Sequence, residues 1–171
     1  MDLNYQQHIP EDFSDDAKVW VYQSSRLFSM SEAFDIEDIL TNFMSNWKSH
    51  GAPVKGYGNL FFGQFIVLMA DESAAKVGGC STDSSIHAIQ EIEKLLKVDL
   101  FNRQNLAFIV NDKIQILPLS QLNYALENNF LQPNSIYINN LVATKKMLLN
   151  DWLIPLKNSW LKTRINLTTT D

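Results

Sequence analysis

The sequence predicts an α+β fold: a ferredoxin-like split β-α-β antiparallel sheet with two helices on one face, followed by a mainly helical C-terminal extension. Three observations lead to this prediction. Apolar runs of strand length and helical repeats follow the order β-α-β-β-α-β, with one more strand after them. Residues typical of helix caps precede both helical repeats. The composition, 46% apolar and 19% charged, is ordinary for a soluble domain of 171 residues.

We expect one domain over residues 1–171, with the α+β core at 18–117 and the extension at 118–165 packed on it. The core opens with a strand at 18–25, which is rich in β-branched and aromatic residues. Ser29 and Glu32 then have the spacing of a capping box. The residues that follow on one helical face, up to His50-Gly51, are Ile36, Ile39, Leu40, Phe43 and Trp47.

A hairpin follows this helix, with strands at Pro53–Phe61 and Gln64–Ala70 and a tight turn at Phe62-Gly63. The second strand is apolar throughout, which indicates burial on both faces of the sheet. Because the two helices cover one face, something else must cover the other. The candidates are residues 119–161 of the same chain, which we favour because they are rich in apolar residues, or a second subunit.

The second helix is expected to begin near Thr82 or Asp83, both good cap residues. It is expected to bury Ile86, Ile89, Ile92, Leu95 and Leu96. Two strands, Leu106–Val110 and Lys113–Leu117, then meet at a turn over Asn111-Asp112. The extension should hold a short helix capped by Ser120, a strand at Ile136–Ile138 and a helix at Ala143–Leu149.

Charge and composition narrow the possible partners. Fourteen Lys and Arg against nineteen Asp and Glu give a net charge of −5, which disfavours nucleic acid. The sequence contains no run of about 18 apolar residues, the length that a membrane-spanning helix needs. The polar, acidic segment Met1–Asp16 does not resemble a secretory signal. Its residues Glu11, Asp12, Asp15 and Asp16 are expected on the solvated surface and not as paired catalytic carboxylates. A single cysteine fits a reducing compartment, so we expect a cytoplasmic protein.

The segment that stands out chemically is Gly78-Gly79-Cys80-Ser81-Thr82-Asp83-Ser84-Ser85. Cys80, beside a helix start that lowers thiol pKa values, is the candidate nucleophile, with His87 or His50 as its base. A buried structural cysteine is the competing interpretation. The free N–H groups of a helix start also favour a small anion, held by Gly79, Cys80, Ser81, Thr82, Asp83, Ser84 and Ser85. Ordinary capping explains these residue types as well.

Other chemistry is not indicated. His8, His50 and His87 are far apart and have no cysteine or carboxylate at metal-ligand spacing, so we expect no metal and no cofactor. Asp71-Glu72, at the end of the apolar strand, is an acid candidate, although a polar strand exit is the simpler interpretation. Gly56-Tyr57-Gly58 lacks the remaining residues of a phosphate loop.

Four segments resemble a family of small uncharacterised bacterial proteins that are often labelled automatically as ABC transporter ATPases. They are Val19-Trp20-Val21-Tyr22-Gln23, His50-Gly51-Ala52-Pro53, Gly79-Cys80-Ser81-Thr82-Asp83-Ser84-Ser85 and Asn139-Asn140-Leu141-Val142. The label itself does not fit, because such an ATPase needs a phosphate loop and this sequence has none. The resemblance therefore implies bacterial relatives and no activity.

These observations favour a non-enzymatic cytoplasmic binding or interaction domain that recognises a small anion or a protein partner near Cys80. The alternative is a thiol-dependent enzyme with Cys80 as nucleophile. A third possibility is a homodimer whose sheets enclose a ligand cavity, so the chain could be a monomer or a homodimer.

Overall fold

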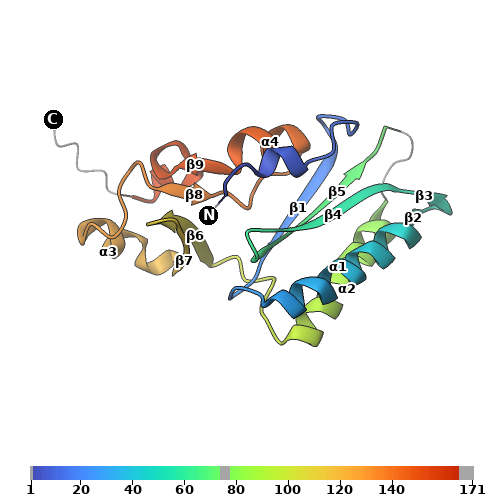
Figure 1. Ribbon diagram of the computed structural model, residues 1–171. Coiled ribbons are helices and arrows are strands. Elements are labelled where there is room, and N and C mark those ends of the chain that lie inside the picture. The colour runs from blue at the N-terminus through green and yellow to red at the C-terminus, as the bar shows by residue number, and fades with distance from the viewer. Residues whose placement is uncertain (1, 74–77, 166–171) are drawn as a thin grey trace.

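The described part of the chain folds into two larger antiparallel sheets that lie next to each other, with two long helices under the first, and a small two-stranded antiparallel sheet, β2-β3 (Figure 1). The computed structural model describes residues 2–73 and 78–165, without the side chains of residues 80 and 81. The elements are η1 Tyr5–His8, β1 Lys18–Gln23, α1 Met30–Asn46, β2 Lys48–Ser49, β3 Ala52–Pro53, β4 Lys55–Phe61, β5 Phe65–Asp71, α2 Gly79–Leu96, β6 Asn105–Val110, β7 Lys113–Pro118, η2 Leu119–Gln121, α3 Leu122–Glu127, β8 Ile136–Ile138, α4 Lys145–Asp151, β9 Leu153–Pro155, η3 Leu156–Asn158 and η4 Trp160–Thr163, where η marks a 3-10 turn.

The first sheet has the strand order β1-β5-β4, with both neighbouring pairs antiparallel. Helix α1 starts at the predicted capping box: Ser29 Oγ accepts from the N–H of Glu32, and the Glu32 carboxylate accepts from the N–H of Ser29. The hairpin between β4 and β5 also turns where predicted. Phe62 and Gly63 both have positive φ, 54° and 63°, as a turn with two left-handed residues requires.

Strand β5 lies in the middle of this sheet and is buried along its whole length, as its continuous apolar sequence predicts. Its residues alternate between two cores. Ile66 and Leu68 pack with Ile36 and Leu40 of α1 and with residues of α2. Phe65, Val67 and Met69 face the opposite core. Both sides of the sheet are therefore covered within this one chain.

The cover on the second face comes from both ends of the chain. Trp152, just after α4, is fully buried, and the ring centroid of Tyr5 lies 4.9 Å from its own. The C-terminal extension thus provides cover, as predicted. The N-terminal segment also provides cover, because Tyr5, Ile9 and Phe13 are buried in the same core. Its acidic residues Glu11, Asp12, Asp15 and Asp16 are exposed, as expected.

The second sheet has the order β7-β6-β8-β9, all antiparallel. It packs with α3 and the 3-10 turns around a core that includes Phe108, Leu131 and Leu161. Helix α3 begins at Leu122 and its cap position is Gln121, so Ser120 does not cap it as expected. Instead Ser120 lies within the 3-10 turn η2 that leads into α3.

The expected four-stranded sheet differs from the observed one, because β6 joins the second sheet and not β1. The outer edge of β1 is already in use. The N–H of Val19 donates to the carbonyl of Ala143, and Lys18 forms a bridge with Thr144. The structure is mixed α and β with antiparallel sheets, while the finer ferredoxin-like assignment stays a prediction.

Candidate functional site

Helix α2 begins at Gly79, three to four residues before the expected start at Thr82 or Asp83. Gly78 occupies the cap position in an extended conformation and makes no side-chain cap hydrogen bond. Thr82 Oγ1 donates to the carbonyl of Gly78, and Ser85 Oγ donates to the carbonyl of Thr82. Their hydroxyls therefore bond backward inside the helix, a use that a sequence pattern cannot tell from capping.

Among the predicted anion-binding residues, Thr82, Asp83, Ser84 and Ser85 have described side chains. These four follow each other along α2 and so point in successive directions around its axis. Gly79, Asp83 and Ser84 are exposed, while Ser85 is buried. The side chains of Cys80 and Ser81 lie outside the described part, so the roles predicted for them stay predictions.

Cys80 and His87 are seven residues apart in α2, which corresponds to a rise of about 10.5 Å. This separation is too large for a direct hydrogen bond between a thiol and an imidazole. The histidine beside the start of α2 is His50, whose Nε2 lies 2.8 Å from the position that a Cβ on Gly78 would take. Ser49 adds a link, because its Oγ accepts from the N–H of Gly78 at 3.2 Å. Two of the segments that carry the family resemblance thus meet here.

The other two segments meet at the junction of the sheets. Asn140 Nδ2 donates to Gln23 Oε1 at 2.8 Å, and the indole N–H of Trp152 donates to Asn140 Oδ1 at 3.3 Å. Gln23 Nε2 donates in turn to the carbonyl of Asn105 at the start of β6. Each of these amides has a protein partner, so the junction is a structural polar network.

Two predicted residues, Ser84 and His87, line a groove of about 520 Å³ between α1 and α2. The residues that line this α1–α2 groove are Ile39, Asn42, Phe43, Asn46, Trp47, Lys48, Ser84, His87, Ala88 and Glu91. They come from the second half of α1, the segment after it and the first half of α2. The groove exists because two amphipathic helices turn their apolar faces to the sheet and leave their flanks facing each other.

The floor of the groove is aromatic and rigid. The ring centroids of Phe43 and Trp47 are 5.0 Å apart, and Trp20 of β1 lies behind, at 6.3 Å from Trp47. Trp47 is 2% exposed and lies so close to Gly56 that a Cβ there would come within 2.7 Å of Trp47 Cε3. The glycine therefore allows the indole to pack on β4, which fixes the groove's floor.

The rim of the groove is polar. Ser84, His87 and Glu91 share one face of α2, at spacings of three and four residues. Nδ1 of His87 lies 3.1 Å from Oε1 of Gln90; an amide oxygen only accepts, so Nδ1 carries the proton. A relay of the serine–histidine–carboxylate kind needs that nitrogen to bond Glu91. The arrangement can bind a ligand but does not form such a relay.

Sequence reasoning missed Asn42, Asn46, Lys48 and Glu91. A signal was available, because Asn42 and Asn46 are four residues apart beside the apolar stripe of α1. Asn46 Nδ2 donates to the carbonyl of Asn42, so this spacing also orders the pair. Their position opposite α2 could not be deduced without the packing of the helices.

Asp71, the acid candidate, is buried and ionised. Burial by itself raises the pKa of its carboxyl, but hydrogen bonds from the N–H groups of Ser14 and Ser73, with the charge of Lys55, outweigh it and lower the pKa to about 2. Such a group donates no proton at neutral pH. The simpler interpretation, a polar strand exit, therefore fits better.

Within residues 2–73 and 78–165, no three His, Cys, Asp or Glu residues form a group that could hold a metal ion. In the same part of the chain, no helix combines the length and apolar character that crossing a membrane requires. Comparison of the sequence and structure with protein-family models, curated proteins and solved structures gives no match.

Proposed function

We propose that this chain is a non-enzymatic binding or interaction domain and that the α1–α2 groove holds its ligand. The observation that carries the proposal is the groove: at about 520 Å³ it lies within the usual size of small-molecule sites, about 300–1,000 Å³. An apolar floor with a few convergent polar groups is the typical lining of such sites. Of the residues predicted for the site, Ser84 and His87 line this groove. The proposed site therefore lies in the groove and not at the start of α2.

The chemistry of the lining favours a small organic anion with a flat apolar body. Phe43, which is partly exposed, offers ring surface on which a flat molecule can stack, and the buried Trp47 supports it from behind. Lys48 stands on the rim and can donate a hydrogen bond to a carboxylate or phosphate. Glu91 is the one carboxylate among the described lining residues, and it should weaken binding of an anion by repulsion.

A thermal-shift titration with aromatic carboxylates tests this proposal, with phosphate and citrate as anions that lack a flat apolar body. We expect a saturable rise in melting temperature with at least one aromatic carboxylate, because binding stabilises the native state. Lys48→Met should weaken that binding and Glu91→Gln should strengthen it. Lys113→Met is the matched control, since Lys113 is an exposed lysine of β7, in the other sheet, and does not line the groove. The absence of any saturable shift refutes the proposal.

The alternative, a thiol-dependent enzyme, gains one supporting observation: His50 lies next to Gly78, at the start of the helix that carries Cys80. The rate of Cys80 alkylation against pH, with the unfolded chain as reference, separates the two proposals. Fast labelling with an apparent pKa well below about 8.5 supports the enzyme. Slow labelling at every pH refutes it. Cys80→Ser should abolish turnover and leave the fold intact if the thiol is the nucleophile.

Two finer assignments belong to the same proposal. The unit from β1 to α2 is ferredoxin-like with its fourth strand, β6, diverted into a second sheet; the order β1-β5-β4 and the shared core of α1 and α2 support this. The protein works in the cytoplasm, a location supported by its single cysteine.

A further inference from the structure

Strand β4 forms an open edge of the first sheet. Strand β5 pairs with one side of it, and within the described residues no strand pairs with the other side over Lys55–Phe61. Two hydrogen bonds show which backbone groups face outward: the N–H of Val54 donates to the carbonyl of Trp47, and that of Leu60 donates to Asn59 Oδ1. Because outward groups alternate along an antiparallel strand, those of Gly56 and Gly58 also face outward.

This edge lacks the devices that usually prevent strand addition. Edge strands are commonly protected by an outward lysine, a proline or a bulge. The one lysine of β4, Lys55, is held by Asp12 and Asp71, with Nζ 4.6 Å from the ring centroid of Phe13. No proline lies within Lys55–Phe61.

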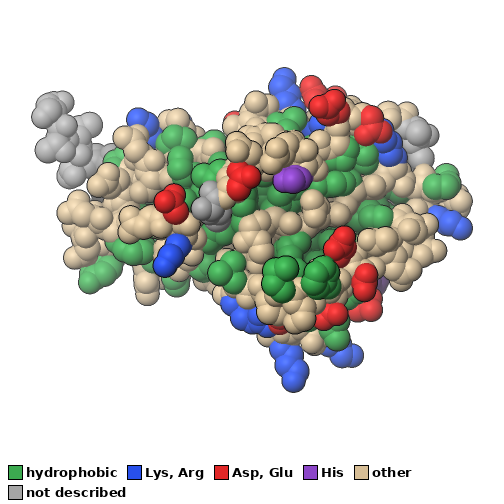
Figure 2. Space-filling model, viewed as in Figure 1, with side chains coloured by type: hydrophobic (Ala, Val, Ile, Leu, Met, Phe, Trp, Pro, Cys, Tyr) green, Lys and Arg blue, Asp and Glu red, His purple; other side chains and the backbone are tan. Residues whose placement is uncertain are grey.

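A hollow lies on each side of the edge, and Asn59 and Leu60 line both. The first, about 310 Å³, lies against α1 and exposes the apolar side chains of Met30 and Phe34, which are 74% and 60% exposed. Figure 2 shows apolar side chains gathered below the edge, over the start of α1, with acidic side chains next to them.

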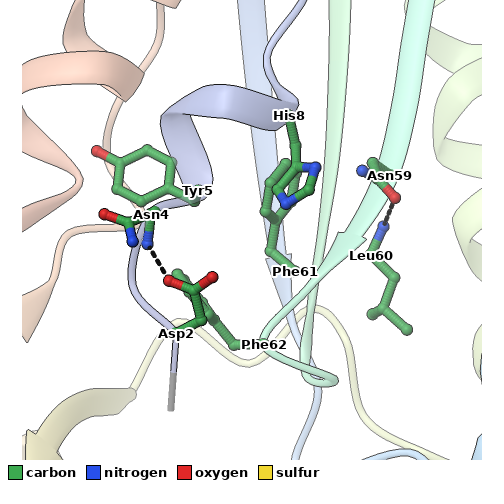
Figure 3. A pocket seen from close by; sticks show the side chains of 8 residues that line it. All are labelled: Asp2, Asn4, Tyr5, His8, Asn59, Leu60, Phe61 and Phe62. Atoms are coloured by element: carbon green, nitrogen blue, oxygen red, sulfur yellow. Dashed lines mark hydrogen bonds between the residues drawn. The ribbon is translucent and has the colours of Figure 1, made fainter.

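The second hollow, about 490 Å³, lies between the N-terminal segment and the β4–β5 turn (Figure 3). Its lining includes the polar side chains of Asp2, Asn4 and His8, across from Asn59 on the strand. A strand added to β4 would direct successive side chains alternately into the two hollows, because side chains alternate between the faces of a sheet.

We propose that an extended segment of a partner protein binds to the edge of β4 as an additional strand. Its apolar side chains enter the hollow beside α1, and its intervening side chains, which are lysine or arginine, enter the hollow beside η1. The charge of the surface favours basic residues, since Asp2 lines one hollow and Glu37 the other in a chain of net charge −5. The backbone pairing supplies affinity and the two hollows supply specificity.

A second copy of this chain fits the edge less well. If two β4 strands paired about a two-fold axis, each would direct Gly56, Gly58 and Leu60 toward the α1 side of its partner. Glycine has no side chain with which to fill the apolar hollow, and two acidic surfaces would come together. The edge is also distinct from the α1–α2 groove, so loss of one site leaves the other testable.

A synthetic peptide tests the proposal by fluorescence polarisation. The probe is acetylated, amidated and fluorescein-labelled, with the sequence Ser-Lys-Phe-Lys-Val-Lys-Ser. We expect saturable binding with a Kd below about 1 mM, and at least about tenfold weaker binding when the lysines are replaced by glutamates. Two further probes carry N-methyl groups on alternate residues. Only one edge of the peptide can pair with β4. The probe whose N-methyl groups lie on the other edge should therefore bind normally, and the probe whose N-methyl groups lie on the paired edge should bind at least about tenfold more weakly.

Two variants locate the binding. Phe34→Glu places a charge at an exposed position in the apolar hollow and should weaken binding at least about tenfold. Leu95→Glu is the matched control, since Leu95 is 56% exposed on α2 and lines neither hollow. The proposal is overturned by no binding at about 1 mM, by equal responses of the two N-methylated probes, or by equal effects of the two variants. A dimer of twice the 19.6 kDa monomer mass that Phe34→Glu dissociates would assign the edge to a second copy instead.

Discussion

Replacing Asp71 with asparagine should lower the free energy of unfolding by about 2 kcal/mol at pH 7. Asp71 lies at the end of β5 and is 3% exposed. Its Oδ2 accepts from the N–H of Ser14 and its Oδ1 from the N–H of Ser73, each at 3.0 Å. Lys55 Nζ lies 3.5 Å from Oδ2. The carboxylate therefore ties the N-terminal segment to the edge of the sheet.

The magnitude follows from the pKa. The pKa of the Asp71 carboxyl is lowered from 3.8 to about 2, which at about 1.4 kcal/mol for each pKa step corresponds to roughly 2 kcal/mol of preference for the charged form. An independent argument gives a similar size. Asparagine keeps one acceptor oxygen, so one of the two N–H groups would face an amide NH₂, and a buried unsatisfied donor costs about 1–3 kcal/mol.

The pH dependence has a definite sign. Because the folded pKa is lowered, the stabilisation by Asp71 is present above the unfolded pKa of 3.8 and is lost as pH falls toward 2. The difference between wild type and Asp71→Asn should therefore be constant from pH 5 to 7 and fall to about half by pH 3. Glu32, whose pKa the Arg26 hydrogen bonds also lower to about 2, titrates in both proteins and cancels in this difference.

Urea unfolding followed by tryptophan fluorescence measures the effect, with Asp35→Asn as the control. Asp35 is an exposed residue of α1, so its replacement should change stability by less than about 0.5 kcal/mol. If Asp71→Asn is no more destabilising than Asp35→Asn, or if its effect does not shrink at low pH, the assignment of Asp71 as an ionised anchor is wrong.

Three further changes test the layer that covers the first sheet. Trp152→Ala should cost about 3–5 kcal/mol in chemical unfolding, because the indole is fully buried, whereas Trp160→Ala, at a side chain 37% exposed, should cost far less. Lys145→Met should cost about 2–3 kcal/mol by the same measurement, because the buried ammonium donates to two backbone carbonyls of the N-terminal segment. Tyr5→Phe should cost about 1 kcal/mol at pH 7, since the hydroxyl donates to the carbonyl of Leu148 at 2.7 Å. Burial and, to a smaller extent, the charge of Asp151 raise the pKa of Tyr5 to about 12. The stabilisation by Tyr5 is therefore present below pH 10 and is lost between pH 10 and 12. A Tyr5→Phe effect on stability that stays constant over that range would contradict this.

The sequence predicted the local elements of this fold well, because their signals lie within a few residues. The capping box at Ser29, the left-handed turns at Phe62-Gly63 and Asn111-Asp112, and the strand at Ile136–Ile138 are all confirmed. The start of α2 was misplaced because the hydroxyls of Thr82 and Ser85 serve the helix interior as readily as its cap.

The candidate sites were predicted only in part, because each depends on segments far apart in the chain. Ser84 and His87 were named from the sequence, but Asn42 and Lys48 reach them only through the packing of α1 on α2. The β4 edge was part of a predicted hairpin, yet its openness depends on whether another strand pairs with it. No pattern within β4 carries that information.

By itself the sequence determined where helices, turns and strands form and that β5 is buried on both faces, since backbone preferences and apolar periodicity are local properties. The tertiary structure alone decided which strands pair, which residues cover the sheet and where grooves remain. Strand β6 could have paired with β1, but it pairs with β7 and β8, and the start of the β1 edge, at Lys18 and Val19, is bonded to Ala143 and Thr144. Such choices depend on competition between distant segments for the same hydrogen bonds and the same apolar surface, which only the folded chain resolves.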